Sequence, residues 1–344
     1  MKRIYLGFIV FSVAIITIWR PAYGQDSLQA LYKAAKAEGE VTIWSPLDPW
    51  EIRLFAEEFS KEFPGIKINQ FEIRPDDYAP RVIAEARQGM VSLDVGTGRL
   101  VGLIPLLSRG LIQGYDDWTK VFKDLNPEHV SKDGRLLSQY SLLYLLAYNP
   151  KLIKPEEVPT SWDDLLNPKW KGRIILEPRV NAFAYLGLKW GEEKMVSYLK
   201  RLKQQDPVYV KGGARVNQQL IAGVAPLAVG TYVHQVLQKQ SEGAPIAWAE
   251  KVSPIGSTDN VVFAAKGAKH PNAAKLFAGW LSADKAQRLM NAKMFRGTPV
   301  PGSPYGAAKT IQKHKVEIIP ESLENHKEAA RLNKIAVKVI GVLR

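Results

Sequence analysis

The chain has no cysteine, few histidines and fewer acidic than basic residues. Its 344 residues hold no Cys and 5 His, and 34 Asp and Glu face 47 Lys and Arg. The lack of Cys excludes a disulfide-bonded scaffold. One long apolar run, residues 4–19, is too little for a polytopic membrane protein. A hydrophobic content of 46% excludes a disordered chain, and Gly and Pro without a period exclude a collagen-like one.

The apolar run has the features of an export signal. Lys2 and Arg3 precede it, and the small residues Ala22 and Gly24 follow it. A charged start, an apolar stretch shorter than a spanning helix and a small-x-small exit are typical of a cleaved signal peptide. We therefore expect residues 1–24 to be a signal peptide and the mature protein to be periplasmic, without a lipid anchor. The alternative is an uncleaved membrane anchor.

The mature chain is basic. Residues 1–24 hold three of the 47 Lys and Arg and none of the 34 Asp and Glu, so the rest carries a net charge of +10. Such a charge suits nucleic acid, an anionic membrane surface or an anionic small molecule. The densest cluster, Lys200, Arg201 and Lys203, ends a predicted helix, where cations complement the helix dipole. No nucleic-acid-binding module is present, so we predict no nucleic-acid partner.

The first part of the mature chain alternates between strand and helix patterns. Apolar periodicity predicts helices at 27–38, 49–63, 76–88 and 100–107, and strands at 40–44, 66–71 and 91–95. This order predicts a parallel sheet with helices on both faces. Ligands of such sheets bind beyond the carboxyl ends of the strands. The Gly96/Gly98 pair lacks the third glycine of a dinucleotide loop, so we read both as turn residues.

A second α/β unit follows the first. Strands are predicted at 140–148, 172–177, 208–210 and 226–229, and helices at 182–190, 192–203 and 213–223. After residues 253–256, a strand at 260–264 and a helix from His270 return to the first unit, and a last helix follows Pro320.

The sequence offers no catalytic constellation. It contains no Gly-x-Ser-x-Gly and no His-x-x-x-His, and its His residues are scattered. The adjacent carboxylates Asp76/Asp77 and Asp163/Asp164 stand at predicted helix starts, where they complement the dipole. We therefore predict no catalytic residue, no cofactor and no enzymatic activity.

The predicted strand-to-helix junctions instead supply candidate ligand-binding residues from both units. Each residue has a plain structural alternative as a turn or cap residue. The candidates are Ser45, Asp48, Trp50, Thr97 and Arg99 on the first unit, and Glu177, Arg179, Asn181, Arg215 and Tyr232 on the second.

Three segments resemble those of a known family. Residues 148–152 (YNPKL), 159–174 (PTSWDDLLNPKWKGRI) and 269–277 (KHPNAAKLF) are similar to the signature of bacterial extracellular solute-binding proteins, in particular the ferric-iron-type binding proteins of ABC importers. The resemblance implies a type II periplasmic-binding-protein fold, with two doubly wound α/β lobes joined by two crossover strands. Lobe 1 would comprise residues 25–139 plus 254–319, lobe 2 residues 140–253, and residues 320–344 a C-terminal helix.

The sequence departs from the iron-binding pattern at one position. Iron-binding members hold the metal with two successive tyrosines, and here Tyr232 is followed by Val233. Between residues 25 and 128 there is also no His to serve from the first lobe. We therefore expect a small organic anion, clamped by Arg99 with Arg179 or Arg215, as the cargo. Ferric iron, with Tyr232 as its metal ligand, is the alternative, and a lone tyrosine predicts no phenolate-to-iron absorption band.

These observations predict the solute-binding subunit of an ABC importer. It would capture a small solute between its lobes as a monomer and deliver it to a membrane permease. The rival hypothesis from another class is an exported α/β transferase that uses the same cleft.

Overall fold

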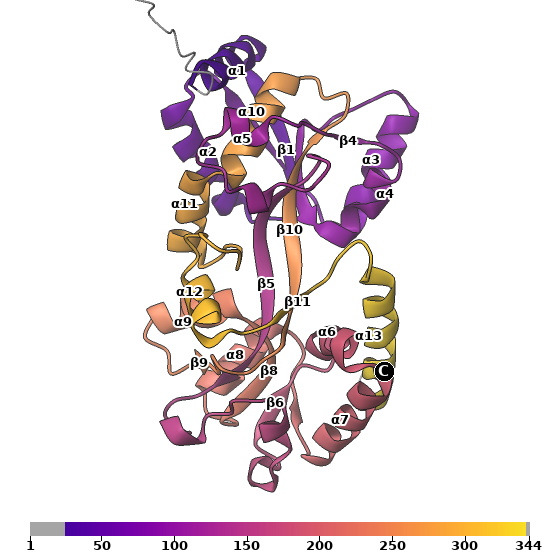
Figure 1. Cartoon of the computed structure of the whole chain (residues 1–344), viewed down its shortest axis with the longest axis vertical. Helices are drawn as coiled ribbons and strands as arrows, with labels where there is room; N and C mark the ends of the chain where they lie inside the picture. Colours follow the sequence, from indigo (N-terminus) through magenta and orange to yellow (C-terminus); the bar gives the residue numbers. More distant parts are fainter. Residues whose placement is uncertain (1–24, 342–344) are drawn as a thin grey trace, which may run out of the picture.

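The computed structural model describes residues 25–341, which form two α/β lobes stacked along the long axis (Figure 1). One continuous sheet runs through both lobes in the order β2-β1-β3-β10-β5-β8-β6-β7, with β4 and β11 on β10 and β9 on β5. The predicted signal peptide lies outside the described residues. Within the described part of the chain, no helix is long and apolar enough to cross a membrane.

The first lobe is built on three parallel strands, as the sequence predicts. β1 (Glu40–Ser45) pairs in parallel with β2 (Lys67–Glu72) and β3 (Val95–Arg99). The helices between and beside them are α1 (Gln25–Glu38), α2 (Pro49–Glu62), α3 (Pro75–Arg87) and α4 (Ile104–Leu107). β4 (Ile112–Gln113) and α5 (Trp118–Val121) lead to the second lobe.

The third strand begins later than predicted. Residues 91–94 are irregular, and β3 starts at Val95 and includes Gly96 and Gly98. Both glycines thus lie in a buried strand rather than in a turn. The chain after β3 forms a 3-10 turn, Leu100–Leu103, before α4, where a continuous helix is predicted.

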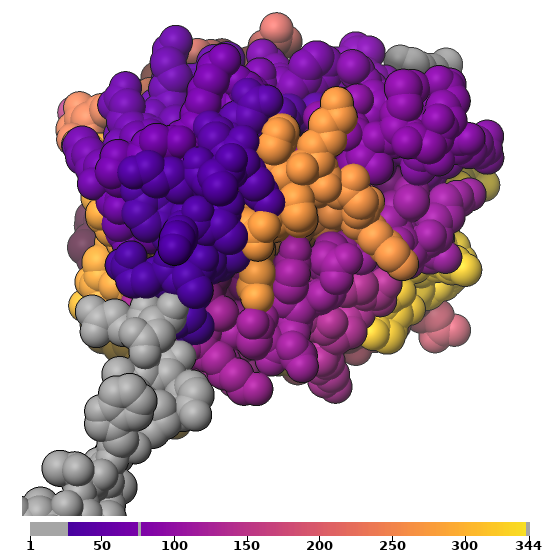
Figure 2. All heavy atoms as spheres, turned by 90° about the horizontal axis from the view of Figure 1, so that it is seen from above, coloured from indigo at the N-terminus to yellow at the C-terminus, as the bar shows by residue number. Residues whose placement is uncertain are grey.

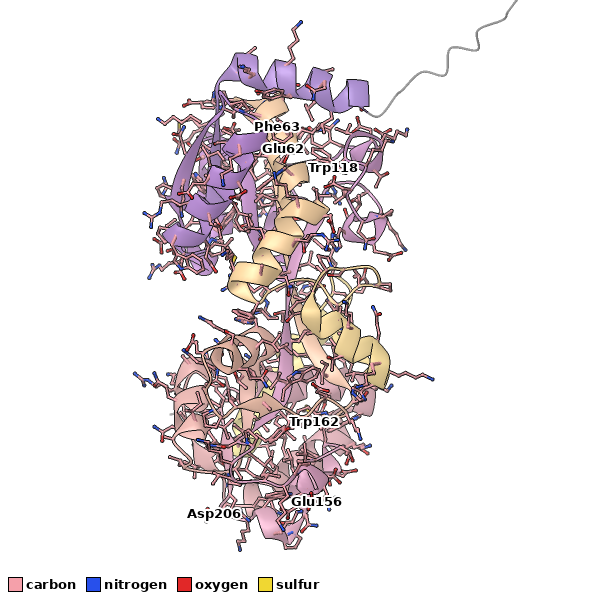
Figure 3. The ribbon with its side chains drawn as sticks, turned by 90° about the vertical axis from the view of Figure 1, so that its left-hand side faces the viewer. Glu62, Phe63, Trp118, Glu156, Trp162 and Asp206 are labelled. Carbon is pink, nitrogen blue, oxygen red and sulfur yellow. The ribbon has the colours of Figure 1, made fainter. Side chains whose placement is uncertain are left out.

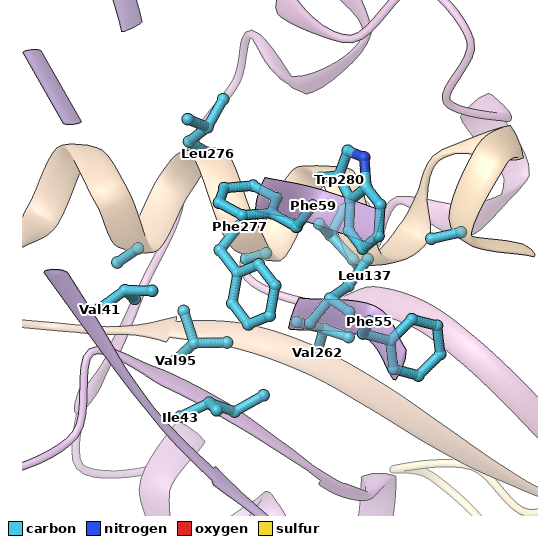
Figure 4. Packing of buried hydrophobic residues seen from close by; sticks show 14 of the residues in the cluster. Val41, Ile43, Phe55, Phe59, Val95, Leu137, Val262, Leu276, Phe277 and Trp280 are labelled. Atoms are coloured by element: carbon cyan, nitrogen blue, oxygen red, sulfur yellow. The ribbon is translucent and has the colours of Figure 1, made fainter. Parts of the chain in front are cut away.

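Aromatic side chains fill the core of the first lobe. Phe59 of α2 lies 4.9 Å from Phe277 and 5.4 Å from Trp280, measured between ring centroids. Figure 4 shows these rings against Val41 and Val95 of the sheet. The partners at 277 and 280 belong to α10 (Pro271–Ser282), so the late part of the chain completes this core. Seen from above, the returning segment lies at the surface between parts of the first half (Figure 2).

The second lobe has the same layered build. β8 (Leu227–Tyr232) pairs with β6 (Ile174–Leu176), which pairs with β7 (Val208–Tyr209), both in parallel. The helices are α6 (Asn181–Trp190), α7 (Glu192–Gln204), α8 (Gly213–Ile221) and α9 (Val233–Ser241), and β9 (Ala247–Trp248) precedes the return to lobe 1. The predicted helix near Trp162 is a pair of 3-10 turns, Asp163–Leu166 and Pro168–Trp170.

Two long antiparallel strands connect the lobes. β5 (Leu137–Tyr148) and β10 (Ile255–Ala265) pair with each other and extend into both halves of the sheet. Figure 1 shows them crossing the waist of the molecule side by side. Their paired backbones form the connection about which the lobes would rotate.

The chain after α11 (Asp284–Met294) returns to the second lobe. α12 (Gly306–His314) packs with residues of β5 and β8, and β11 (Ile318–Pro320) pairs with β10. The last helix, α13 (His326–Ile340), packs against α6 and α7. The lobe limits given above remain a prediction, but both of these helices lie on the side of the second lobe.

Candidate functional site

Three tyrosines converge where the second lobe faces the connecting strands. Tyr144 of β5 and Tyr232 at the end of β8 are register partners, with ring centroids 5.0 Å apart. Tyr185 of α6 also packs against Tyr144, with ring centroids 5.3 Å apart. The hydroxyl group of Tyr144 interacts with both neighbours. We call Tyr144, Tyr185 and Tyr232 the tyrosine cluster.

Two glycines make room for side chains in and beside this cluster. A Cβ on Gly256 of β10 would meet the ring of Tyr185 at 2.5 Å. Gly230 of β8 has a φ of +110°, and a Cβ there would meet Glu177 Cβ at 2.1 Å. Since any other side chain would collide with a backbone-anchored neighbour, glycine is required at both positions.

An arginine from the first lobe contacts the cluster. Arg99, at the end of β3, donates a hydrogen bond from Nη2 to the hydroxyl oxygen of Tyr185 at 2.9 Å. It also forms an ion pair with the buried carboxylate of Glu321, with 2.7 Å between Nη2 and Oε2. Tyr185 in turn donates to Glu321 Oε1 at 3.3 Å. Arg99 thus joins the first lobe to the second through a phenol and a carboxylate.

A second arginine–glutamate pair lies on the other side of the cluster. Arg179 Nε donates to Glu177 Oε1 at 2.6 Å, and the amides of Arg179 and Gly212 also donate to this buried carboxylate. The guanidinium is about half exposed and lies within electrostatic range of Tyr232 and Tyr144. Glu177 therefore holds one side of the Arg179 guanidinium, and the other side of the guanidinium faces solvent.

Burial sets the protonation state of the inner phenols. Removal from water raises the pKa of Tyr144 well above the ordinary value, and the charge of Arg99 counteracts this only in part. The pKa of Tyr185 is raised for the same reason, again against the influence of Arg99. Both phenols are therefore neutral at pH 7 and become anionic only if a cation displaces their protons.

Next to Arg99 an open pocket of about 320 Å³ lies between the first lobe and the helices of the second. Arg99 and Val101 line it from the first lobe, Asn181 and Tyr185 line it from α6, and residues of α13 form another wall. Of the sequence-predicted residues, Arg99 and Asn181 thus share one pocket, Tyr232 is part of the tyrosine cluster, and Glu177 and Arg179 lie beside it.

The remaining predicted residues lie elsewhere. Ser45 and Thr97 are buried and bonded to each other, with 2.7 Å between the hydroxyl oxygens, so they join β1 to β3 rather than line an open surface. Asp48 is the N-cap residue of α2, and Trp50 next to it is 46% exposed. Arg215 is exposed in the first turn of α8.

Sequence reasoning missed Tyr144, Tyr185 and Glu321. The two tyrosines occur within apolar stretches and read as core residues, and Glu321 is 222 residues from its partner Arg99. Among the described residues, no group of three or more His, Asp or Glu is placed to hold a metal ion.

The family model for bacterial extracellular solute-binding proteins matches residues 104–320. The chain belongs to this family. Its members are extracellular solute-binding proteins, and the resemblance found in the sequence is confirmed.

Curated relatives include proteins named for iron. A segment of 142 residues is 28% identical to "Iron uptake protein A1" of Synechocystis, covering 40% of this chain and 38% of that one. Another of 179 residues is 24% identical to the "Fe(3+)-binding periplasmic protein" of Serratia marcescens, covering 48% and 52%. An uncharacterized Haemophilus influenzae protein is 31% identical over 140 residues, which are 39% of this chain and 40% of that one. The chain thus aligns with about two fifths to one half of each relative's length.

Solved structures share the whole fold. Iron-bound HitA from Pseudomonas aeruginosa superposes with a TM-score of 0.66 at 18% identity, covering 88% of this chain and 99% of that one. Trichodesmium FutA with iron and citrate gives 0.66 at 16% identity, with the same shares covered. At these identities the likeness concerns the fold, which is the predicted type II periplasmic-binding-protein fold.

Proposed function

We propose that this protein is the binding subunit of a ferric-iron importer and that the tyrosine cluster holds the metal. The observation that carries the proposal is the convergence of three phenols from β5, α6 and β8. Phenolate is a hard, anionic oxygen donor, which is the donor type that Fe(III) prefers. The iron-binding names of two relatives support the same cargo.

The charges of the site support a trivalent cation. Glu321 balances Arg99 and Glu177 balances Arg179, so these pairs leave the site without net charge. Three phenolates would neutralise one Fe(III), and an octahedral ion would keep open positions. A small anion can fill these positions and face the free edges of Arg99 and Arg179. The organic anion expected from the sequence then becomes a companion of the metal.

Absorption spectroscopy tests this proposal. Adding ferric nitrilotriacetate to the mature protein should produce a visible phenolate-to-iron charge-transfer band, contrary to the expectation from a lone Tyr232. Tyr232→Phe and Tyr144→Phe should each weaken or abolish the band. Tyr148→Phe is the matched control, because Tyr148 faces Leu227 at the opposite end of β8. No band with the parent protein would refute the iron assignment.

A second measurement separates the two cargo hypotheses. Arg99 and Arg179 keep 44% and 49% of their side chains exposed, so an organic anion alone has two cations to bind. Calorimetry with citrate in iron-free buffer should give weak binding that ferric iron strengthens. Equal affinity for citrate with and without iron would support the organic-anion hypothesis instead.

A further inference from the structure

Seven exposed cations lie on three segments of lobe 2, near the ends of the strands that are opposite to the tyrosine cluster. We call this set the basic patch. Its residues lie just before β6, in the last turns of α7 and on the exposed side of α13: Lys171, Arg173, Lys200, Arg201, Lys203, Lys334 and Lys338. β6 and β8 are parallel. Arg173, just before β6, and Tyr232, at the end of β8, therefore lie at opposite ends of these strands.

The backbone brings the three segments together. α7 and α13 run side by side in the same direction, since Glu192 at the start of α7 pairs with Arg331, and Lys203 near its end donates to the carbonyl of Val339. The amide of Gly172 donates to the carbonyl of Gln205 at 2.7 Å, which ties the segment before β6 to the end of α7. Residues distant in sequence therefore form one surface.

The seven cations of the basic patch outnumber the acids beside the end of α7, which are Asp163 and Asp164 near Tyr198 and Asp206 after Gln205. Neither residues 194–205 nor residues 329–341 contain an Asp or Glu. Within residues 25–341, none of the seven cations forms an ion pair, whereas the neighbouring Arg331 pairs with Glu192 and Glu328. Acids border the patch at the tip of the lobe, where Figure 3 shows Glu156 and Asp206. The helix dipoles of α7 and α13 account for cations in their last turns but not for Lys171, Arg173 or Lys334.

The surface suits a layer of anionic headgroups better than a protein partner. Protein interfaces are centred on buried aromatic or aliphatic anchors. The large apolar side chains that are exposed among the described residues all lie outside the patch: Trp50, Phe71, Met90, Leu152, Val224 and Leu323. Clustered Lys and Arg without an apolar anchor are typical of attraction to anionic lipid.

We propose that the basic patch binds the anionic phospholipid surface of the membrane that holds the permease. This interaction is independent of the cargo and goes beyond the proposed function. A solute-binding component that is weakly held at the bilayer searches for its permease close to the membrane rather than through the whole compartment. Because the attraction is electrostatic, salt should weaken it.

Vesicle sedimentation with the mature protein tests the proposal. The probes are vesicles of phosphatidylcholine with roughly one third phosphatidylglycerol, and vesicles of phosphatidylcholine alone. The patch variant replaces Lys171, Lys200, Lys203, Lys334 and Lys338 by Gln. The matched control replaces five exposed lysines without an ion pair elsewhere among the described residues: Lys33, Lys67, Lys120, Lys266 and Lys309. Both variants reduce the net charge of the mature chain from +10 to +5.

The parent protein should bind the anionic vesicles and not the neutral ones, and raising NaCl from about 50 mM to about 300 mM should release it. The patch variant should lose at least tenfold in partition coefficient, and the control variant less than threefold. Equal loss in both variants would mean that binding follows net charge and would overturn the proposal. No binding of the parent protein to these protein-free vesicles would also overturn it and leave the patch to a protein partner.

Discussion

Tyr185 combines the contacts that decide how a cation enters the site. Its hydroxyl group accepts a hydrogen bond from Arg99 and donates one to Glu321. Burial raises its pKa and that of Tyr144, so both protons are present in the empty protein at pH 7. Iron binding to phenolates therefore has to release protons, and affinity must rise with pH below these pKa values.

This linkage predicts how many protons are released for each iron bound. Loading the parent protein with ferric nitrilotriacetate should release at least two protons per iron, from Tyr144 and Tyr185. Tyr185→Phe should release about one proton fewer. The rise of its iron affinity with pH should therefore be about tenfold smaller for each pH unit. A pH-stat titration of both proteins measures the difference. The same proton count in both would mean that Tyr185 does not ligate the metal.

Arg179 tests the role of the second guanidinium. Its guanidinium lies within electrostatic range of Tyr144 and Tyr232, and its Nε donates a hydrogen bond to Glu177 Oε1, which fixes its orientation. A charge-assisted hydrogen bond contributes about 1.5–3 kcal/mol, so Arg179→Gln should weaken binding of ferric citrate by about tenfold or more. Arg173→Gln is the matched control, because it lies beyond the other end of β6. Calorimetry should show parent-like affinity for the control, and equal losses in both variants would contradict the assignment.

Among the elements, α10 shows how a contact distant in sequence completes a helix. Its N-cap residue, His270, makes no side-chain cap. The carboxylate of Glu38, at the end of α1, instead accepts hydrogen bonds from the amides of Asn272 and Ala273 at 3.1 and 2.7 Å. These donors have no partner within the helix, so Glu38 acts as its cap.

Removing this cap should destabilise the first lobe. Glu38→Ala leaves two amides of α10 without their partner, and the loss of a cap costs about 1 kcal/mol. Glu57→Ala, on the exposed side of α2, should stay close to the parent protein. Urea unfolding of both variants measures the difference in midpoint. Equal midpoints would show that the capping contact does not contribute to stability.

The same distinction explains what the sequence could and could not predict. Local apolar patterns predict β1, α2 and α10, and α10 is buried on most of its surface rather than along one stripe. The start of β3 was predicted too early, since Gly96 and Gly98 look like a turn, yet they pair with Phe263 and Val261 of β10. Strand pairing between residues so far apart leaves no local pattern.

The site follows the same logic. Arg99, Glu177, Arg179, Asn181 and Tyr232 could be proposed because they follow predicted strands. Tyr144 and Tyr185 have apolar neighbours, and their approach to Tyr232 depends on how α6 packs over Gly256. The sequence without the fold therefore shows Tyr232 as an apparently single tyrosine, and this favours the organic anion over iron.

At the scale of the whole molecule, the tyrosine cluster and Arg99 belong to opposite lobes. β5 supplies Tyr144, and Gly256 of β10 packs against Tyr185. The first lobe supplies Arg99. A cargo that contacts both sides binds a closed arrangement more tightly than an open one, and this difference shifts the population. Changing the closed-to-open ratio from 1:99 to 99:1 requires about 5.5 kcal/mol.

Closure should therefore depend on Arg99 more than iron capture does. Ferric citrate should reduce the radius of gyration of the parent protein in solution scattering. Arg99→Ala keeps all three phenols, so it should retain a charge-transfer band at saturating iron while its radius of gyration changes less. Arg53→Ala, an exposed residue of α2, is the control and should close like the parent protein. Full compaction of the Arg99 variant would show that the cargo closes the lobes through other contacts, because the phenols alone would then supply the difference in affinity between the two states.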